Sequence, residues 1–277
     1  MEPRLLLDGL AFPEGPRWHE GRLWFSDIHV GDVIAVGLDG AAEVIVHVPS
    51  LPSGLGWLPD GTLLIVSVDD RQVLRLDGKE TAIHGDLAHL ATFGCNDMVV
   101  DGQGRAYVGS CDNAGIPQPA PGELLLVQPD GRASVADPSL RFSNGSVVTP
   151  DGRTLIVAET FGDCLTAFTI ADDGSLVDRR VWAPLGGGVP DGIALDAEGA
   201  VWYADPAANA CVRVREGGEV TDRIPTSQPC FACMLGGDTR TTLFLLTSSS
   251  PSPARTVKDR PGRIEMVEVD VPGAGWP

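Results

Sequence analysis

Four side chains with oxygen donors recur at matching places along this 277-residue chain. Glu14, Asn96, Asn144 and Asp191 each open a segment in which an apolar run, a turn and a second apolar run follow. Two carboxylates and two amides are ligands of the kind that hard divalent cations prefer, with water completing the shell. The set favours Ca²⁺ and leaves Mn²⁺, Mg²⁺ and Zn²⁺ open. If the fold brings these residues together, they predict one divalent metal site.

The segments that carry these residues repeat along the chain. Ser53 and Cys230 open two further copies, which gives six starts at intervals of roughly 39 to 48 residues. Apolar runs joined by pairs such as Asp60-Gly61 are typical of β-hairpins. A period of this length with several strands in each copy predicts an all-β fold, a six-bladed β-propeller with four-stranded antiparallel blades. We expect residues 1–277 to form one such domain around a central channel that contains the metal.

The elements of a propeller would position the candidate ligands. The first strand of every blade lines the channel, so the six starts are expected at one mouth of it. Asn-Gly and Asp-Gly pairs are also ordinary turn residues, which is the alternative for each start taken alone, but the shared register favours convergence. We further expect the apolar run 5–7 to close the ring beside residues 263–269, and the stretch 248–262, rich in Ser and Pro, to form a loop.

Composition argues against several classes of partner. The formal net charge of −18 disfavours nucleic acid and anionic membranes, because binding to either requires clustered Lys and Arg. No run approaches the ~20 apolar residues of a membrane helix, and the first residues lack the pattern of a signal peptide. We therefore expect a cytoplasmic protein whose six cysteines are reduced thiols. The oligomeric state is left open.

Other reactive residues show weaker patterns. Cys230 and Cys233 form a C-x-x-C pair without a second pair, which favours core packing over a zinc or redox site. The five histidines show no spacing typical of a metal pair or a catalytic dyad, and they are expected to be structural or exposed. A G-x-S-x-G nucleophile elbow is absent from the sequence.

Longer motifs surround five of the six starts. They are Phe-Pro-Glu-Gly-Pro-Arg-Trp (12–18), Pro-Ser-Gly-Leu-Gly-Trp (52–57), Asn-Asp-Met-Val-Val-Asp (96–101), Asn-Gly (144–145) and Val-Pro-Asp-Gly-Ile-Ala-Leu-Asp (189–196). These motifs resemble the successive signatures of the senescence-marker-protein/gluconolactonase/luciferin-regenerating-enzyme family, over nearly the whole chain.

The resemblance implies a six-bladed propeller in which Glu14, Asn144 and Asp191 hold a divalent metal. It also implies that Asn96 reaches the metal or the substrate and that Asp191 activates water, in a hydrolase that acts chiefly on lactones. The chemistry agrees, because a divalent ion can polarise a lactone carbonyl as a Lewis acid while a neighbouring carboxylate takes the proton of water. Asp191 is therefore the predicted general base, with direct nucleophilic attack by Asp191 as the alternative.

Residues near the repeat starts are expected to contact a small-molecule lactone or similar cyclic ester. The predicted substrate-binding residues are Asn96, Cys95, Phe93, Asn113, Ser53 and Phe231. Asn113 belongs to the long loop 111–117, which could cover the channel mouth. Sugar-lactone hydrolysers of the family resembled usually carry Arg two residues before the first Asn, where this chain has Gly94. That departure predicts a less polar substrate.

Two other functions remain open. A non-catalytic metal- or metabolite-binding propeller would use the same ligands without turnover, and only an assay separates it from a hydrolase. A condensing enzyme similar to strictosidine synthase would use a related propeller without a metal. The nearly complete set of oxygen ligands favours the metal-dependent hydrolase.

Overall fold

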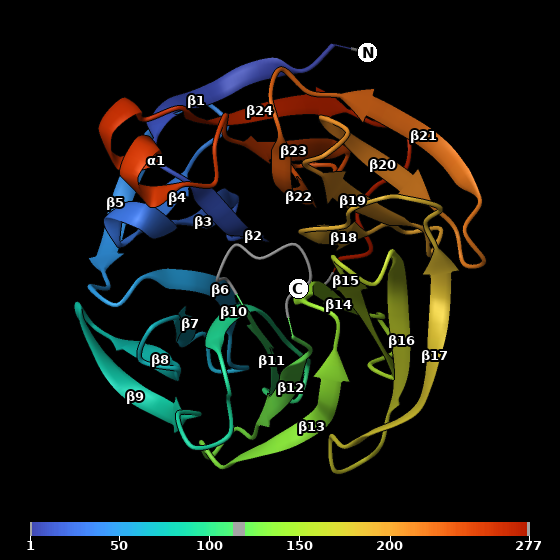
Figure 1. Ribbon diagram of the computed structural model, residues 1–277. Helices are drawn as coiled ribbons and strands as arrows, with labels where there is room; N and C mark the ends of the chain where they lie inside the picture. The colour runs from blue at the N-terminus through green and yellow to red at the C-terminus, as the bar shows by residue number, and fades with distance from the viewer. Residues whose placement is uncertain (1, 113–119, 276–277) are drawn as a thin grey trace.

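The structure, a computed structural model, describes residues 2–112 and 120–275. Its strands form six four-stranded antiparallel sheets, arranged as blades around a central axis (Figure 1). The predicted six-bladed β-propeller is therefore confirmed.

Each blade runs from an inner strand at the channel to an outer strand at the rim. The first three blades are β2 (Pro13–His19), β3 (Arg22–Asp27), β4 (Asp32–Val36) and β5 (Ala42–His47); β6 (Pro52–Trp57), β7 (Leu63–Ser67), β8 (Gln72–Asp77) and β9 (Glu80–Asp86); and β10 (Gly94–Val100), β11 (Ala106–Cys111), β12 (Gly122–Val127) and β13 (Ala133–Leu140). The last three are β14 (Ser143–Val148), β15 (Thr154–Glu159), β16 (Cys164–Ile170) and β17 (Leu176–Pro184); β18 (Ile193–Leu195), β19 (Val201–Asp205), β20 (Ala210–Val214) and β21 (Val220–Pro225); and β22 (Cys230–Gly236), β23 (Thr242–Thr247), β24 (Gly262–Glu268) and β1 (Arg4–Leu10).

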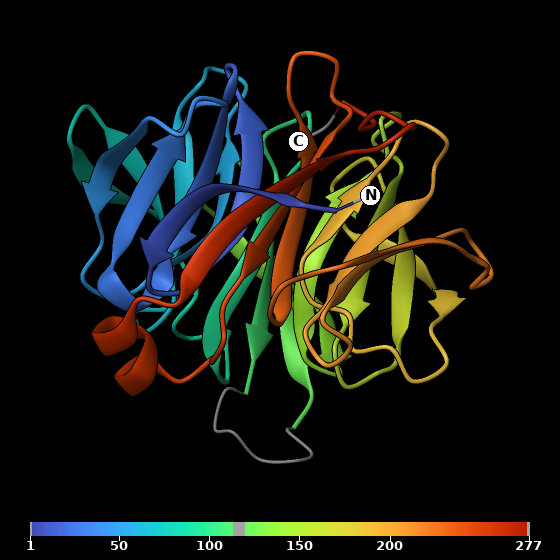
Figure 2. The ribbon, with the colours of Figure 1, turned by 90° about the horizontal axis from the view of Figure 1, so that it is seen from above.

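The last blade closes the ring with the two ends of the chain. β1 pairs antiparallel with β24, with Leu5 opposite Glu265 and Leu7 opposite Ile264. Figure 2 shows β1 lying along β24 at the rim. The predicted closure of the ring by residues 5–7 is confirmed, and it removes the exposed edge that an unclosed sixth blade would leave.

The inner strands have a bulge near the end at which they begin. We call this end of the channel, which carries Glu14, Ser53, Asn96, Asn144 and Asp191, the upper mouth, and the opposite end the lower mouth. The pairing register shifts just after the start of β2, β6, β10, β14 and β22. Because a bulge re-aims the side chains beside it, the start residues are freed from regular pleating.

Glycines next to the repeat starts let neighbouring blades approach closely. A β-carbon on Gly54 would lie 2.2 Å from Met98 N, and one on Gly145 would lie 2.5 Å from Ile193 N. Both neighbours belong to the inner strand of the following blade. The Ser53-Gly54 and Asn144-Gly145 pairs therefore pack blade against blade, in addition to any turn preference.

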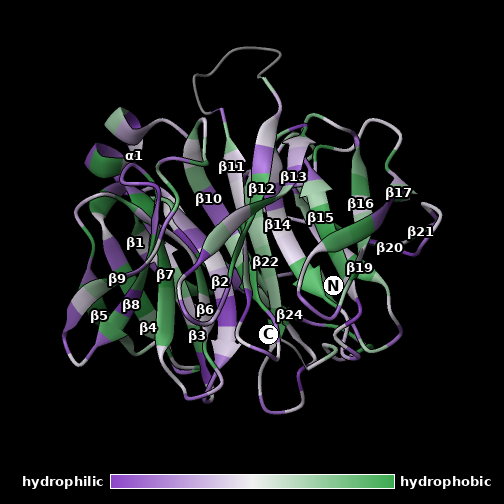
Figure 3. Cartoon of the chain, turned by 90° about the horizontal axis from the view of Figure 1, so that it is seen from below, coloured by the Kyte–Doolittle hydropathy of each residue, from purple (hydrophilic) through white to green (hydrophobic). Residues whose placement is uncertain are grey.

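Apolar side chains fill the space between adjacent blades. The buried clusters each join two neighbouring blades, for example Leu64 and Val66 of β7 with Val108 and Leu125 of the third blade. Figure 3 shows hydrophobic residues mainly along the strands and many hydrophilic ones in the connections. This packing holds the inner strands in fixed positions around the channel.

The lower mouth is covered by the end of the described chain. Ala274 N donates to Leu195 O at 3.0 Å, Gly273 N donates to Arg240 O at 2.9 Å, and Gly273 forms a β-bridge with Asp196. Gly273 and Ala274 also line a small cavity that reaches Arg17 in the channel. Access to the centre of the channel is therefore expected from the upper mouth.

The stretch 248–262 differs from its prediction as a loop. It contains a helix, α1 (Pro253–Asp259), which packs against the short 3₁₀ helix η1 (Ile28–Val30). Pro253 occupies the first turn, where its missing N–H costs nothing, and Arg260 ends the helix in the left-handed conformation with φ of 47°. The helices among residues 2–112 and 120–275 are too short or too polar to span a bilayer.

Candidate active site

The structure brings the four predicted metal ligands together at the upper mouth. Glu14 lies on β2, Asn96 on β10 and Asn144 on β14, while Asp191 lies two residues before β18. The Asn96 amide contacts the Asn144 amide, and the charges of Glu14 and Asp191 act on each other. Residues up to 177 positions apart in a chain of 277 thus face one point because each opens a blade.

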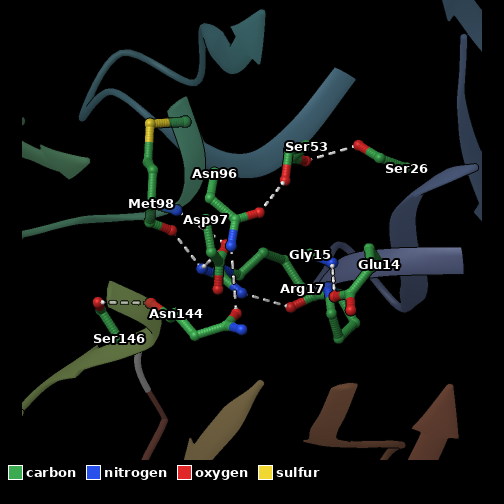
Figure 4. A network of polar contacts seen from close by, with 11 residues as sticks. Glu14, Gly15, Arg17, Ser26, Ser53, Asn96, Asp97, Met98, Asn144 and Ser146 are labelled. Carbon is green, nitrogen blue, oxygen red and sulfur yellow. Dashed lines mark hydrogen bonds and ion pairs between the residues drawn. The ribbon is translucent and has the colours of Figure 1, made fainter. Parts of the chain in front are cut away.

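A chain of hydrogen bonds orients the amides of the site (Figure 4). Ser53 Oγ donates to Asn96 Oδ1 at 3.3 Å, and Asn96 Nδ2 donates to Asn144 Oδ1 at 3.4 Å. Asn144 Nδ2 donates to Thr160 Oγ1 at 3.2 Å, and Thr160 Oγ1 donates to Pro190 O at 2.8 Å. Each amide oxygen accepts one bond and keeps a second lone pair. Sequence reasoning missed Thr160, which lies outside the repeated motif.

Glu14 and Asp191 are the carboxylates of the site, and both have a raised pKa. Burial raises the pKa of Glu14 well above its ordinary value and the charge of Asp191 adds to this, whereas the Gly15 N–H, 3.0 Å from Oε2, opposes it. Burial, followed by the charge of Asp97, raises the pKa of Asp191 well above its ordinary value, against the Asn144 amide.

One oxygen of Asp191 marks where a ligand is needed. Asp191 is 8% exposed, and among the described atoms its Oδ1 is buried without a hydrogen-bond partner. A buried polar atom without a partner is costly, and a carboxylate oxygen in this state is best satisfied by a cation or a donor.

A buried ion pair lies beside these carboxylates (Figure 4). Arg17 Nη2 is 3.2 Å from Asp97 Oδ1 and also donates to Met98 O, and Arg17 Nη1 donates to Pro16 O at 2.7 Å. Arg17 is 3% exposed and Asp97 is 7% exposed. Sequence reasoning missed this pair. The sequence does contain a sign of the pair. Glycine follows the repeat starts Glu14 and Asn144, whereas Asp97 follows Asn96.

The charges at the mouth fit a divalent cation. Asp191, Asp97 and Arg17 all act on the pKa of Glu14, so three carboxyl groups share one guanidinium. When all three are ionised, two negative charges remain in excess, which a divalent ion would neutralise. Within the described residues, no three His, Cys, Asp or Glu side chains are arranged to hold a metal. The candidate site therefore depends on the amide oxygens, and its all-oxygen set suits a hard ion.

The predicted substrate-binding residues are not all at the mouth. Ser53 and Asn96 belong to the hydrogen-bond chain, and Phe93 is half-buried just before β10. Cys95 is fully buried in the apolar cluster of the second and third blades, where burial raises the pKa of its thiol to about 12. Asn113 lies outside the described residues.

The sixth repeat start contributes no oxygen donor. Cys230 is fully buried in the apolar cluster of the last two blades, together with Cys211 and Cys233. The Cys233 thiol donates to Gly192 O at 3.6 Å. The C-x-x-C pair therefore packs in the core, as predicted.

An aromatic wall stands on one side of the upper mouth. It consists of Phe12, His29 and Phe231, with ring centroids 4.7 Å apart for Phe12 and His29 and 4.8 Å apart for Phe12 and Phe231. His29 is half-buried in η1, and burial lowers the pKa of its imidazole to about 4. The expectation that the histidines are structural or exposed does not include the stacking of His29 on Phe12, because η1 belongs to an irregular connection that the repeats do not describe.

The sequence of this chain is similar to a known family and to two lactonases. A family model described as "SMP-30/Gluconolactonase/LRE-like region" matches residues 12–249. A 6-deoxy-6-sulfogluconolactonase of Pseudomonas putida is 32% identical over 193 residues, which cover 66% of this chain and 64% of that protein, so the match spans just under two thirds of the relative's length. The pentonolactonase XacC of Haloferax volcanii is 26% identical, over 85% of this chain and 81% of that protein.

Solved structures share the fold. A calcium-binding protein, regucalcin, from Agrobacterium tumefaciens has a TM-score of 0.84 at 21% identity, covering 99% of this chain and 96% of that one. A gluconolactonase from Xanthomonas campestris has a TM-score of 0.76 at 22% identity, covering 97% and 88%. The family match, the propeller and the converging start residues together show that this chain belongs to the SMP-30/gluconolactonase/LRE-like family.

Proposed function

We propose that the protein is a divalent-metal-dependent hydrolase that opens a lactone or a similar cyclic ester. Glu14, Asn144 and Asp191 would hold the ion, with Asn96 reaching the ion or the substrate. Ca²⁺ is the favoured ion because every side-chain donor is an oxygen, and because a structural relative is named as calcium-binding. The relatives named as lactonases support a small-molecule lactone as substrate.

One observation carries this proposal: the buried Oδ1 of Asp191 lacks a partner among the described atoms, beside a second carboxylate with a raised pKa. Such a pair would be destabilising in a purely structural role, and perturbed carboxylates of this kind are typical of functional sites. When bound, a divalent ion would supply Lewis-acid polarisation of the lactone carbonyl.

The residues of the chain would perform the proton transfers. Asp191 would take a proton from the water whose oxygen attacks the carbonyl carbon. The bond between that carbon and the ring oxygen then breaks, and the proton returns to the departing ring oxygen, giving a hydroxy acid. A raised pKa suits Asp191 to this task, because a base is most effective when its pKa approaches the working pH. Asn96 and Asn144, fixed by their hydrogen bonds, would orient the ester.

A pH-stat assay tests the proposal. Sugar, aliphatic and aromatic lactones are presented to chelator-treated protein, with and without Ca²⁺, Mn²⁺, Mg²⁺ or Zn²⁺. We expect turnover of at least one lactone to require an added ion. Folded protein that hydrolyses no lactone with any ion would overturn the proposal in favour of a binding role, and equal turnover without metal would remove the ion from the reaction.

A further inference from the structure

The upper mouth has two chemically different sides. The polar side is the chain from Ser53 through Asn96 and Asn144, which spans the second, third and fourth blades. The other side is the aromatic wall of Phe12, His29 and Phe231. Phe231 lies on β22, whose blade stands between the blade of Asp191 and that of Glu14 (Figure 1). The wall therefore occupies the sector between the two carboxylates.

The wall reaches the carboxylates through the backbone. Phe231 O accepts a hydrogen bond from Gly192 N at 2.8 Å, next to Asp191, and Phe12 precedes Glu14 by two residues. The backbone of Phe12 is also tied to η1, because Ile28 N donates to Phe12 O at 3.0 Å. Phe12 and His29 are half-buried and Phe231 is 8% exposed. Because these rings flank both carboxylates, we expect a substituent on a lactone ring held there to lie against the wall.

His29 contributes an uncharged ring to the wall. Its Nδ1 is 2.6 Å from Thr256 Oγ1, and that hydroxyl already has Ser252 O at 3.2 Å and Pro253 O at 3.3 Å as acceptors in α1. Because a hydroxyl has one proton to donate, Thr256 gives it to a carbonyl and accepts from Nδ1–H. This bond fixes the tautomer with its proton on Nδ1, and burial lowers the pKa of the imidazole to about 4, so the ring is neutral near pH 7 and Nε2 is its acceptor.

A charged group beside the wall, Asp27, already has hydrogen-bond partners. Asp27 accepts from Ala11 N at 3.0 Å and from Phe12 N at 2.6 Å, and Arg260 Nη1 lies 3.4 Å from its Oδ2. A sugar ring placed here would bury hydroxyls against aromatic faces with one acceptor to share, which costs free energy for each unpaired hydroxyl. A flat apolar ring would instead gain aromatic contact.

We propose that the aromatic wall selects lactones that carry a flat aromatic substituent and discriminates against polyhydroxylated ones, with Phe231 and His29 as specificity-determining residues. The inference rests on the lactonase function proposed above. Phe12 positions both rings through its two contacts, and Thr256 holds Nδ1–H, so that Nε2 faces away from α1.

Three γ-lactones with the same reacting ring test the selection in the Ca²⁺-loaded protein: γ-butyrolactone, its γ-phenyl derivative and ribono-1,4-lactone. We expect kcat/KM for the phenyl compound to exceed that of each of the other two by about tenfold or more, in line with roughly 1.4 kcal/mol from aromatic contact. Phe231→Leu and His29→Gln should reduce this ratio about fivefold, and His29→Phe should restore most of it.

His19 supplies the matched control. It is stacked on Trp57 with centroids 4.0 Å apart, at the lower end of β2, so His19→Gln removes an equivalent stacked imidazole far from the wall. The phenyl preference should be unchanged in that variant. A preference that falls equally in His19→Gln and His29→Gln, or a wild-type protein that prefers ribono-1,4-lactone, would overturn the inference.

Binding of a lactam separates this inference from the proposed function. Calorimetry with 5-phenylpyrrolidin-2-one, which resists hydrolysis, should show binding that weakens in Phe231→Leu and persists in His19→Gln. If the lactam binds in this way while no lactone is hydrolysed, the proposed selection by the wall stands and the proposed hydrolase function is wrong. If lactones are hydrolysed and the phenyl group improves neither binding nor kcat/KM, the proposed hydrolase function stands and the proposed selection by the wall is wrong.

Discussion

The two ends of β18 carry two buried aspartates with opposite surroundings. Asp196, at the lower mouth, accepts from Glu198 N at 2.9 Å, Ala200 N at 3.0 Å and Arg213 Nε at 2.6 Å. Asp191, at the upper mouth, has a buried oxygen with no partner among the described atoms and faces further carboxylates. Asp101 repeats the lower arrangement in the third blade, with Arg105 Nε at 2.6 Å.

This contrast separates a structural carboxylate from a functional one. At the lower mouth the two buried aspartates Asp101 and Asp196 are each paired with arginine and backbone N–H groups, as a stable fold requires. At the upper mouth Asp191 has a buried oxygen without a partner among the described atoms, which natural proteins tolerate where a ligand completes the site. Asp191 and Asp196 therefore form a matched pair for experiments.

The largest expected effect is on catalysis. Asp191→Asn removes the proposed base and one ligand, so kcat for the best lactone should fall by about 10³-fold or more. The protein should stay folded, and its chelator-treated form should be no less stable than wild type, because the change removes a repelled charge. Steady-state kinetics and thermal unfolding of the same samples measure both. An active Asp191→Asn variant would exclude Asp191 as base.

The lower aspartate should show the reverse. Asp196→Asn breaks the buried pair with Arg213, and it should lower the free energy of unfolding by about 3 kcal/mol, since removing one partner leaves the other charge buried. Its kcat/KM at low temperature should remain within about twofold of wild type, because Asp196 lies at the far end of the inner strand. Denaturant titration and lactone kinetics test this. Loss of activity without loss of stability would contradict the division between the two mouths.

Calcium should stabilise the proteins that retain Asp191 against unfolding. At a free Ca²⁺ concentration of 100 times the dissociation constant, the folded wild-type protein should gain about 2.7 kcal/mol, and Asp196→Asn should gain as much. Asp191→Asn should gain much less. Thermal unfolding in chelator and in excess Ca²⁺ measures the difference. Equal stabilisation of the two variants would place the ion elsewhere.

A smaller effect concerns pH. The pKa of His29 is lowered to about 4 in the folded protein, below its unfolded value. Its contribution to stability is therefore fully present above pH ~6.5 and is lost as the pH falls towards 4, where the unfolded chain binds the proton more readily. His29→Gln should flatten the decline of unfolding free energy in this window. His19→Gln should flatten it less, because the charge of Glu20 partly offsets the effect of burial on His19.

The repeated parts of the molecule could be predicted from sequence. The starts Glu14, Asn96, Asn144 and Asp191 recur because every inner strand meets the same channel, and the closure by residues 5–7 follows from the need to pair the last blade. The sequence repeat thus predicts both the propeller fold and the convergence of the candidate ligands.

The features outside the period could not be predicted in this way. Arg17 and Asp97 pair across two blades, and Thr160 and His29 lie in connections whose lengths vary between blades. Cys230 shares the register of the ligands, but its side chain lies in the apolar cluster between blades, because the residue type fits there. A position in a repeat places the backbone, and side-chain chemistry decides whether that residue faces the channel.

The central claim is that Glu14 and Asp191, together with the amide oxygens of the upper mouth, hold one divalent cation. Calorimetric titration of Ca²⁺ into chelator-treated wild-type, Asp191→Asn and Asp196→Asn proteins tests it most directly. The account predicts one ion per chain for wild type and Asp196→Asn, and an affinity at least about 100-fold weaker for Asp191→Asn, as expected when a charged ligand is lost. Wild-type protein that binds none of Ca²⁺, Mn²⁺, Mg²⁺ and Zn²⁺, or an Asp191→Asn variant that binds as tightly as wild type, would contradict it.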